Sequence, residues 1–232
     1  MENVTLQTEA FQRLREMIIK TELKPGTKIS ESSLTSILDL GRTPIRESLT
    51  QLKKQQLVYT IPQSGTYVSK IDMLHALDAR FIREAVESEI MVELAAKLTE
   101  SSENLLQGIL DRQKEAFQNK NIKAYYDLDN LFHSNCYKII GKHQVWEWMH
   151  QLNSHLDRFR WLHLQTETFD FNATAQEHQE ILNAVKKGNT SETKYLTINH
   201  IHFILQNQER IIHDYSDYFT EDSLAIMRRQ NG

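Results

Sequence analysis

Apolar residues recur every three to four positions along most of this 232-residue chain, which is the spacing of one face of an α-helix. Near the amino terminus this pattern predicts three short helices. The first ends before the turn Lys24-Pro25-Gly26, the second follows an N-capping Ser30, and the third is capped by Thr43 with Pro44 at its first position. The expected core positions are Leu6, Ala10, Phe11, Leu14, Met17 and Ile18 in the first helix, Leu34, Ile37 and Leu38 in the second, and Ile45, Leu49 and Leu52 in the third.

The pattern becomes strand-like after the third helix. Two β-rich segments, Leu57–Ile61 and Thr66–Ser69, flank Pro62-Gln63-Ser64-Gly65, and this arrangement predicts a hairpin. A helix, the tight turn Leu40-Gly41-Arg42, another helix and a hairpin follow one another in the order of a winged helix-turn-helix. Such a motif places one helix in the major groove of DNA.

The rest of the chain contains no proline, since all three prolines lie within the first 62 residues. Helical periodicity without proline predicts a helical bundle. Gly141 and Gly188 are expected C-caps, and Asn189 with Glu192 resembles a capping pair. The helices are expected at about 72–99, 102–119, 121–140, 143–168, 171–187 and 190–213, with a further short helix at 224–227.

We therefore predict a mainly α protein of two domains: a winged helix-turn-helix domain over residues 1–70 and an all-helical domain of six to seven helices over residues 71–232. Charge differs between them. Residues 1–70 hold ten Lys/Arg and seven Asp/Glu, a net charge of +3, whereas the remainder holds seventeen and twenty-four, a net charge of −7. Nucleic acid favours the basic part, because phosphate neutralisation releases counterions.

Other features of composition narrow the class of protein. The single cysteine, Cys136, excludes an internal disulfide and is compatible with a reducing compartment. No apolar run approaches the ~20 residues of a membrane span, and the amino terminus lacks a signal-like apolar core. The sequence thus predicts a cytoplasmic protein without a membrane partner.

The predicted third helix carries candidate DNA-reading residues at its exposed amino-terminal end. Arg42 stands directly before this helix and Arg46 lies one turn into it. Arginine reads guanine through a bidentate contact that contributes roughly 1–3 kcal/mol of discrimination. Thr43 and Ser48 are further candidates for phosphate or base contacts, and Gly65 would let the wing backbone approach the minor groove. The alternative is a small helical domain with ordinary surface arginines.

A second constellation suggests metal binding. Asp129 and His133 are four residues apart, so one helical turn places both on a face that is otherwise apolar, and His178 and His200 lie on apolar faces of two later helices. Burying four such groups unpaired is costly, and a shared cation removes that cost. Three imidazoles and one carboxylate suit Zn²⁺, and also Mn²⁺, Fe²⁺ or Ni²⁺. The alternative is that each histidine is a hydrogen-bonded core residue, and Cys136 is either a further ligand or a small buried hydrophobe.

The runs Glu22-Leu23-Lys24-Pro25-Gly26 and Gly41-Arg42-Thr43-Pro44-Ile45-Arg46-Glu47-Ser48-Leu49, with the wing at Gly65, resemble the GntR family of bacterial regulators. In that family the two arginines that match Arg42 and Arg46 contact bases, so the resemblance implies this role here. The departures from the family pattern are Asp39 for a glycine, Gly41 for a serine and Ser32 for an arginine that some relatives carry.

The helical region is similar to the FCD effector domain of FadR-type GntR regulators, in which an Asp-x-x-x-His pair and two later histidines bind metal in many members. The resemblance therefore implies a metal site at Asp129, His133, His178 and His200.

The run Arg83-Glu84-Ala85-Val86-Glu87 resembles the Arg-x-x-x-Glu segment at the start of that effector domain. Arg83 would then face the cavity and bind a ligand carboxylate through its planar guanidinium. The alternative is a surface ion pair between Arg83 and Glu87.

These observations lead to a dimeric repressor or activator whose affinity for double-stranded operator DNA depends on a small carboxylate. The carboxylate would complete the metal coordination, bond Arg83 and change the spacing of the two DNA-reading domains. One alternative is a regulator with a structural metal or none that senses a larger apolar ligand such as an acyl-CoA. A metal-dependent hydrolase is the remote alternative, because no glycine-rich phosphate cradle or nucleophile elbow is present.

Overall fold

The computed structural model describes residues 5–230, which form two compact units. The first unit contains residues 5–76, 151–162 and 207–230, and the second contains residues 77–150 and 163–206. The helices α4 (Met73–Lys97) and α8 (Ser154–Leu164) each begin in the first unit and end in the second. Both units therefore draw on residues that are distant in the sequence.

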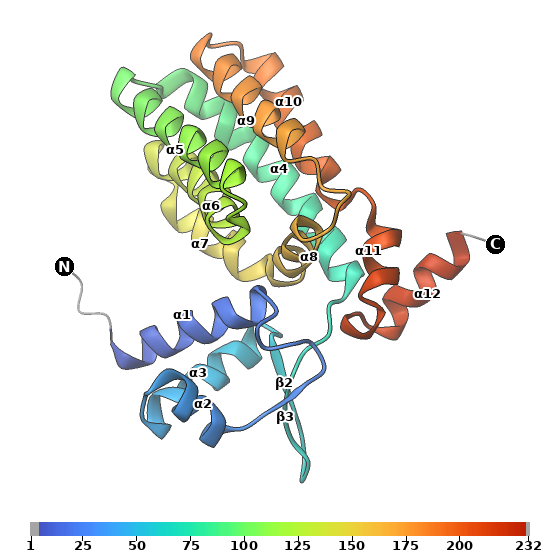
Figure 1. Cartoon of the computed structure of the whole chain (residues 1–232). Helices are drawn as coiled ribbons and strands as arrows, with labels where there is room; N and C mark the ends of the chain where they lie inside the picture. Colours follow the sequence, from blue (N-terminus) through green and yellow to red (C-terminus); the bar gives the residue numbers. More distant parts are fainter. Residues whose placement is uncertain (1–4, 231–232) are drawn as a thin grey trace. The chain divides into compact units, whose positions relative to one another are not determined.

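The amino-terminal part of the first unit is a winged helix-turn-helix (Figure 1). Its elements are α1 (Leu6–Ile19), β1 (Lys28–Ile29), α2 (Glu31–Leu38), α3 (Arg42–Lys54), β2 (Val58–Ile61) and β3 (Gly65–Val68). The strands form an antiparallel sheet in the order β1-β3-β2. The apolar face of α1 packs against α3, and the buried core includes Ala10, Leu14, Ile18, Leu34, Leu38, Ile45 and Leu52. The predicted hairpin and the three helices are confirmed.

Two local expectations for this motif were wrong, and one short strand was missed. Gly41, not Thr43, is the N-cap of α3, and Pro44 occupies the third helical position, where its missing N–H would lack an intrahelical acceptor anyway. The exposed fraction of Ile37 is 53% and that of Leu6 is 61%, so neither belongs to the core. The strand β1 has only two residues, which is too short to produce an alternating pattern in the sequence.

The second unit is a helical bundle, so the predicted fold class is confirmed. Besides most of α4, it contains α5 (Glu100–Gln118), α6 (Ile122–Ile139), α7 (His143–Leu152), α9 (Phe171–Lys186), α10 (Thr190–His202) and the short helix η1 (Phe203–Leu205). The helices α5 and α6 pack together, as do α5 with α9 and α9 with α10 (Figure 1). Their facing apolar side chains fill the interior and include Leu106, Ile109, Phe132, Ile181, Leu182, Val185 and Ile201.

The helix ends of this bundle follow the sequence signals in part. Gly141 and Gly188 follow α6 and α9 with φ values of 77° and 66°, as expected for glycine C-caps. Asn189 accepts the Glu192 backbone N–H at 3.2 Å and donates to its carboxylate at 2.8 Å, which confirms this capping pair.

Two predicted helices are broken. The expected helix 143–168 is interrupted at Asn153 to give α7 and α8, and the expected helix 190–213 ends at His202, before Asn207 adopts a left-handed conformation. Apolar periodicity continues across both breaks, so periodicity alone could not locate them. The chain continues as α11 (Gln208–Asp214), η2 (Ser216–Tyr218) and α12 (Glu221–Gln230).

Residues 69–72, which connect the wing to α4, are held from two sides within the first unit. The fully buried guanidinium of Arg158 on α8 donates to the Ser69 carbonyl at 2.5 Å, and His155 Nδ1 accepts the Asp72 backbone N–H at 2.8 Å. On the other side, the Ile71 backbone pairs with the chain around Phe219. Charged and polar groups of α8 therefore satisfy backbone groups of this connection.

We expect His155 to make the free energy of unfolding depend on pH. Burial, and then the charge of Arg158, lower the pKa of His155 to about 3, compared with about 6.5 for an unfolded chain. Below pH 6.5 the unfolded chain gains a proton that the folded protein does not. The free energy of unfolding therefore decreases as the pH decreases. Between pH 7 and pH 5 this loss is about 2 kcal/mol. Urea denaturation of the parent protein and of His155→Gln at both pH values tests this. Between pH 7 and pH 5 the variant should lose less free energy of unfolding than the parent protein, by this amount. Equal losses in the two proteins would contradict a neutral buried His155.

Candidate nucleic-acid interface and metal centre

The recognition helix α3 presents its amino-terminal end to solvent. Arg42, Thr43 and Arg46 are exposed, and the side chain of Arg46 is 71% accessible. Arg42 and Arg46 are four residues apart, so their side chains leave the same face of α3. In this structure Arg46 donates to the Glu31 carboxylate at the start of α2 through Nε and Nη2, each at 3.2 Å. Three of the predicted DNA-reading residues, Arg42, Thr43 and Arg46, are therefore accessible at this end of α3.

Ser48 must be removed from the predicted set of DNA-reading residues. Its side chain is fully buried, and its hydroxyl lies 2.7 Å from the carbonyl oxygen of Pro44 and 3.2 Å from that of Gln7. Ser48 therefore joins α3 to the start of α1 and has no access to DNA. The sequence suggested otherwise because a serine six residues after Arg42 was not recognised as part of the buried stripe.

The wing is the β2–β3 hairpin, and its turn requires glycine at position 65. Gly65 has a φ of 142°, and a Cβ placed there would lie 2.7 Å from Cε of Lys28. Stacking of Tyr59 on Tyr67, with ring centroids 5.6 Å apart, braces the hairpin. At the turn of the wing, the backbone of Gly65 therefore passes close to the side chain of Lys28.

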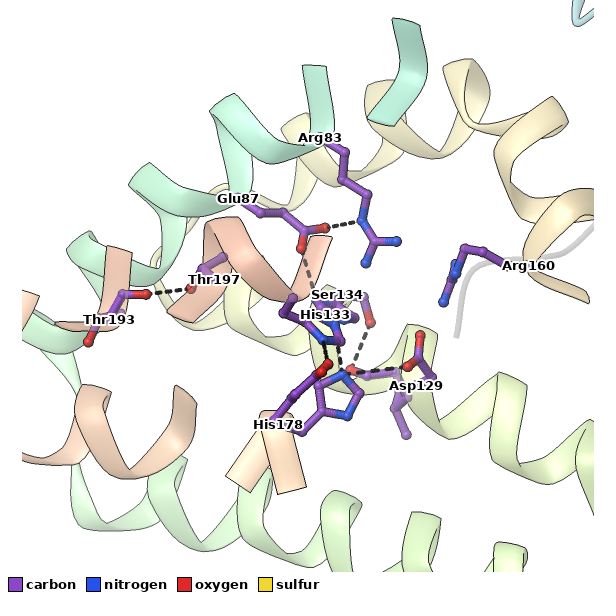
Figure 2. Close-up of polar contacts among 12 residues, drawn as sticks. Arg83, Glu87, Asp129, His133, Ser134, Arg160, His178, Thr193 and Thr197 are labelled. Carbon is purple, nitrogen blue, oxygen red and sulfur yellow. Dashed lines mark hydrogen bonds and ion pairs between the residues drawn. The ribbon is translucent and has the colours of Figure 1, made fainter. Parts of the chain in front are cut away.

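Three buried histidines meet inside the second unit: His133 from α6, His178 from α9 and His200 from α10. Each offers one ligand nitrogen, and all three nitrogens lie within 4.8 Å of one another. His178 Nε2 lies 3.1 Å from His200 Nε2 and 3.5 Å from Oδ1 of Asp129. Figure 2 shows Asp129 and His133 on one helix with His178 facing them. The structure therefore brings together the four residues that the sequence singled out.

The Nδ1 atom of each histidine faces an oxygen atom from a neighbouring side chain. The oxygens are Gln113 Oε1 at 3.1 Å from His178, Glu177 Oε2 at 2.8 Å from His200 and Glu87 Oε2 at 2.9 Å from His133. The contacts of His178 and His200 keep the proton on Nδ1 and leave Nε2 as an acceptor, whereas neither ring nitrogen of His133 has a hydrogen-bond partner among the described residues. Two neutral rings with Nε2 acceptors only 3.1 Å apart repel each other unless a proton or a cation lies between them.

Burial favours the neutral imidazoles of His133 and His178, and the neutral form is the one that binds a metal. Burial lowers the pKa of His133, and burial together with the neighbouring His200 lowers the pKa of His178 well below its ordinary value. Nitrogen ligands about 2.0–2.1 Å from a tetrahedral Zn²⁺ lie roughly 3.3 Å apart, so the spacings around His178 suit a shared ion. His133 Nε2 is buried without a hydrogen-bond partner among the described residues. The donor set therefore fits a divalent metal.

Arg83 on α4 lies beside this cluster. Its Nε donates to Oε1 of Glu87 at 2.8 Å, and both side chains are almost completely buried, with 2% and 1% of their surface accessible (Figure 2). The ion pair exists, but the alternative of a surface pair is wrong. Burial alone would raise the pKa of Glu87, but the charge of Arg83 holds this pKa below its usual range. Within residues 5–230, Nη1 and Nη2 of Arg83 have no hydrogen-bond partner.

Sequence reasoning missed Gln113, which lies on α5 and is 1% exposed. Its amide accepts from His178 and contacts Asp129 Oδ1 at 3.5 Å, so one side chain links two of the clustered residues. The signal was an amide within the buried stripe of α5, which otherwise consists of Leu106, Ile109, Leu110 and Ala116. Cys136 is a buried thiol whose pKa is raised by burial, and it lies outside the histidine cluster.

Comparison with known proteins identifies both parts of the chain. Residues 6–68 match the model of the bacterial regulatory proteins of the gntR family, and residues 78–203 match that of the FCD domain. Among curated relatives, an HTH-type transcriptional regulator in an unstable DNA locus of Streptomyces ambofaciens is 31% identical over 98% of this chain and 95% of its own length. The HTH-type transcriptional repressor RspR of Escherichia coli is 27% identical over 92% and 93%.

Solved structures show the same fold. The Escherichia coli protein McbR/YncC gives a TM-score of 0.77 at 19% identity, covering 91% of this chain and 99% of that protein. A GntR regulator from Rhodococcus gives 0.73 at 20% identity, with coverages of 90% and 98%. Over residues 5–230 no helix is both long and apolar enough to cross a membrane. The chain belongs to the GntR family of bacterial transcriptional regulators with an FCD domain, and the prediction of a regulator rather than an enzyme is confirmed.

Proposed function

We propose that this regulator is a homodimeric repressor that senses a small carboxylate through a divalent metal in its helical unit. The observation that carries the sensing part is the pair of Nε2 atoms of His178 and His200, 3.1 Å apart, in rings whose Nδ1 atoms donate to oxygen acceptors. Two Nε2 acceptors at this distance repel each other unless a proton or a cation lies between them, and we assign that place to the metal. Repressor activity is supported by the names of the relatives RspR and GlaR of Escherichia coli.

Operator DNA is read by α3 and the wing. Arg42 and Arg46 contact base edges in the major groove, Thr43 contacts the backbone or a base, and Gly65 brings the wing backbone close to the minor groove. The support is that Arg42, Thr43 and Arg46 are exposed at the start of α3 and that Gly65 lies at the turn of the wing. A palindromic operator requires two copies of α3 about one DNA turn apart, which is the reason for proposing a homodimer.

Asp129, His133, His178 and His200 hold the metal, with Zn²⁺ the best match and Mn²⁺, Fe²⁺ or Ni²⁺ also compatible with this donor set. A bound metal supplies a Lewis acid to an oxygen atom of the ligand. The residues of this chain orient the site: Gln113 and Glu177 fix the tautomers of His178 and His200, and the Glu87 carboxylate lies 2.9 Å from Nδ1 of His133.

Arg83 binds the carboxylate of the effector. Two buried guanidinium nitrogens without partners are costly, because their desolvation is not offset by a hydrogen bond. A carboxylate relieves this cost through a bidentate contact, for which the planar guanidinium is suited. Ligand and DNA binding are then linked, so each changes the affinity for the other by the same factor.

The proposed function makes a first prediction, which concerns DNA. Arg42→Ala and Arg46→Ala should each cost about 1–3 kcal/mol at the selected operator and remove the preference at one base pair. Lys53→Ala, which removes a charge near the carboxyl end of α3, should weaken binding to all sequences alike. Selection from random duplexes, followed by affinity measurements on single-base variants of the selected site, tests this. Uniform weakening by all three substitutions would contradict base reading by the arginines.

The second prediction concerns metal and effector. Purified protein should contain about one divalent metal per chain, and His178→Ala should lose it. His202→Ala is the matched control, because His202 lies two residues beyond His200 but its side chain is 56% accessible. A carboxylate at 100 times its Kd should raise the Tm by roughly 5–10 °C in the metal-loaded protein only. Arg83→Lys should keep the metal and lose most of this shift.

Three results would contradict this proposal or part of it. Equal metal content in His178→Ala and the parent protein would remove the histidine cluster as the metal site. Metal retention without a response to any mono-, di- or tricarboxylate would make the metal structural. A Tm increase with an acyl-CoA in place of a carboxylate would favour the larger apolar ligand.

A further inference from the structure

The contact between Glu31 and Arg46 joins the two helices of the helix-turn-helix. Glu31 is the first residue of α2, directly after the N-cap Ser30, and Arg46 lies in the second turn of α3. Both oxygens of the carboxylate are used: Arg46 Nε donates to Oε1 and Nη2 donates to Oε2, each at 3.2 Å. Two parallel contacts fix the plane of the guanidinium as well as its position.

The donors that remain on Arg46 are those needed for base reading. A guanidinium has five N–H groups, and Glu31 takes the Nε–H and one of the two on Nη2. Two on Nη1 and one on Nη2 are left, and one from each of these nitrogens points along the end of the side chain, away from Glu31. A guanine presents O6 and N7 as two adjacent acceptors in the major groove, which matches this remaining pair of donors.

The negative charge of Glu31 has a second effect. An acidic side chain beside the reading helix repels the phosphate backbone, so it weakens binding to any sequence. A fixed guanidinium loses little rotational freedom when it meets guanine, so binding to the correct sequence is weakened less. Both effects raise the ratio of specific to non-specific affinity.

We propose that Glu31 is a specificity-determining positioning residue, which holds Arg46 in the orientation that reads one guanine of the operator. This inference rests on the proposed base-reading role of Arg46. It assigns to Glu31 an action through Arg46, without a DNA contact of its own.

Three single variants of the full chain separate positioning from charge. Glu31→Gln removes the charge and one of the two acceptor oxygens. Glu31→Asp keeps the charge and suits the start of α2, but withdraws the carboxylate by one methylene group. Glu47→Gln is the matched control, because Glu47 is the exposed neighbour of Arg46 on α3 and loses the same charge.

Each protein is measured on the operator selected by the parent protein, on its single-base variants and on an unrelated duplex. The base pair read by Arg46 is identified as the one at which Arg46→Ala loses its preference. At that base pair both Glu31 variants should lose about tenfold in discrimination, and Glu47→Gln should lose none. On the unrelated duplex, Glu31→Gln and Glu47→Gln should bind more tightly by similar factors, and Glu31→Asp should not.

Retained discrimination in both Glu31 variants would overturn the inference, as would an equal loss at every base pair or in Glu47→Gln. These outcomes remain distinct from failure of the proposed function. If Arg46→Ala lost no base preference, base reading by Arg46 would itself be wrong. If Arg46→Ala lost its preference and the Glu31 variants did not, only the role of Glu31 would be wrong.

Discussion

The helical unit depends on how the cost of burying ionisable side chains is met. Arg83, Glu87, Asp129 and three histidines lie in the interior of a bundle whose other buried side chains are mostly apolar. A buried charge is tolerated only when it is paired, and a buried imidazole only when its nitrogens find partners. Glu87 lies between Arg83 and His133 and contacts both. The Nη atoms of Arg83 and the Nε2 atom of His133 have no hydrogen-bond partner among the described residues. The uncompensated groups therefore mark where a cation and an anion would stabilise the fold.

In the first unit, backbone carbonyl and N–H groups meet part of the same cost, although Nε2 of His155 has no hydrogen-bond partner among the described residues. Arg158 is as deeply buried as Arg83, but its guanidinium donates to the carbonyl oxygens of Ser69 and Ser154. The buried ring of His155 accepts the Asp72 N–H, so its Nδ1 is satisfied by the backbone as well. These contacts fix the connection between the wing and α4. A buried arginine thus has a structural role where backbone acceptors surround it, and becomes a candidate binding group where they do not.

Much of this architecture could be predicted from the sequence, because it depends on local signals. Helical periodicity, the glycine caps at 141 and 188, and the hairpin at Gly65 each require only neighbouring residues. The spacing of Asp129 and His133 also placed two side chains on one helical face. Spacing could not reveal Gln113, the burial of Ser48, or the packing of α8 with the first unit, because each depends on contacts between distant segments. Long-range packing therefore decides which polar residues of a helix become functional.

Two arginines of the chain are held in the same way, with different consequences. Arg83 and Arg46 each donate Nε to a glutamate, and each keeps Nη donors directed away from it. In Arg83 the pair is buried, so the remaining donors carry a desolvation cost that favours an anionic ligand. In Arg46 the pair is exposed, so the remaining donors are hydrated and the gain lies in orientation. Under the two proposals, burial therefore decides whether a glutamate beside an arginine contributes to affinity for a ligand or to selectivity among bases.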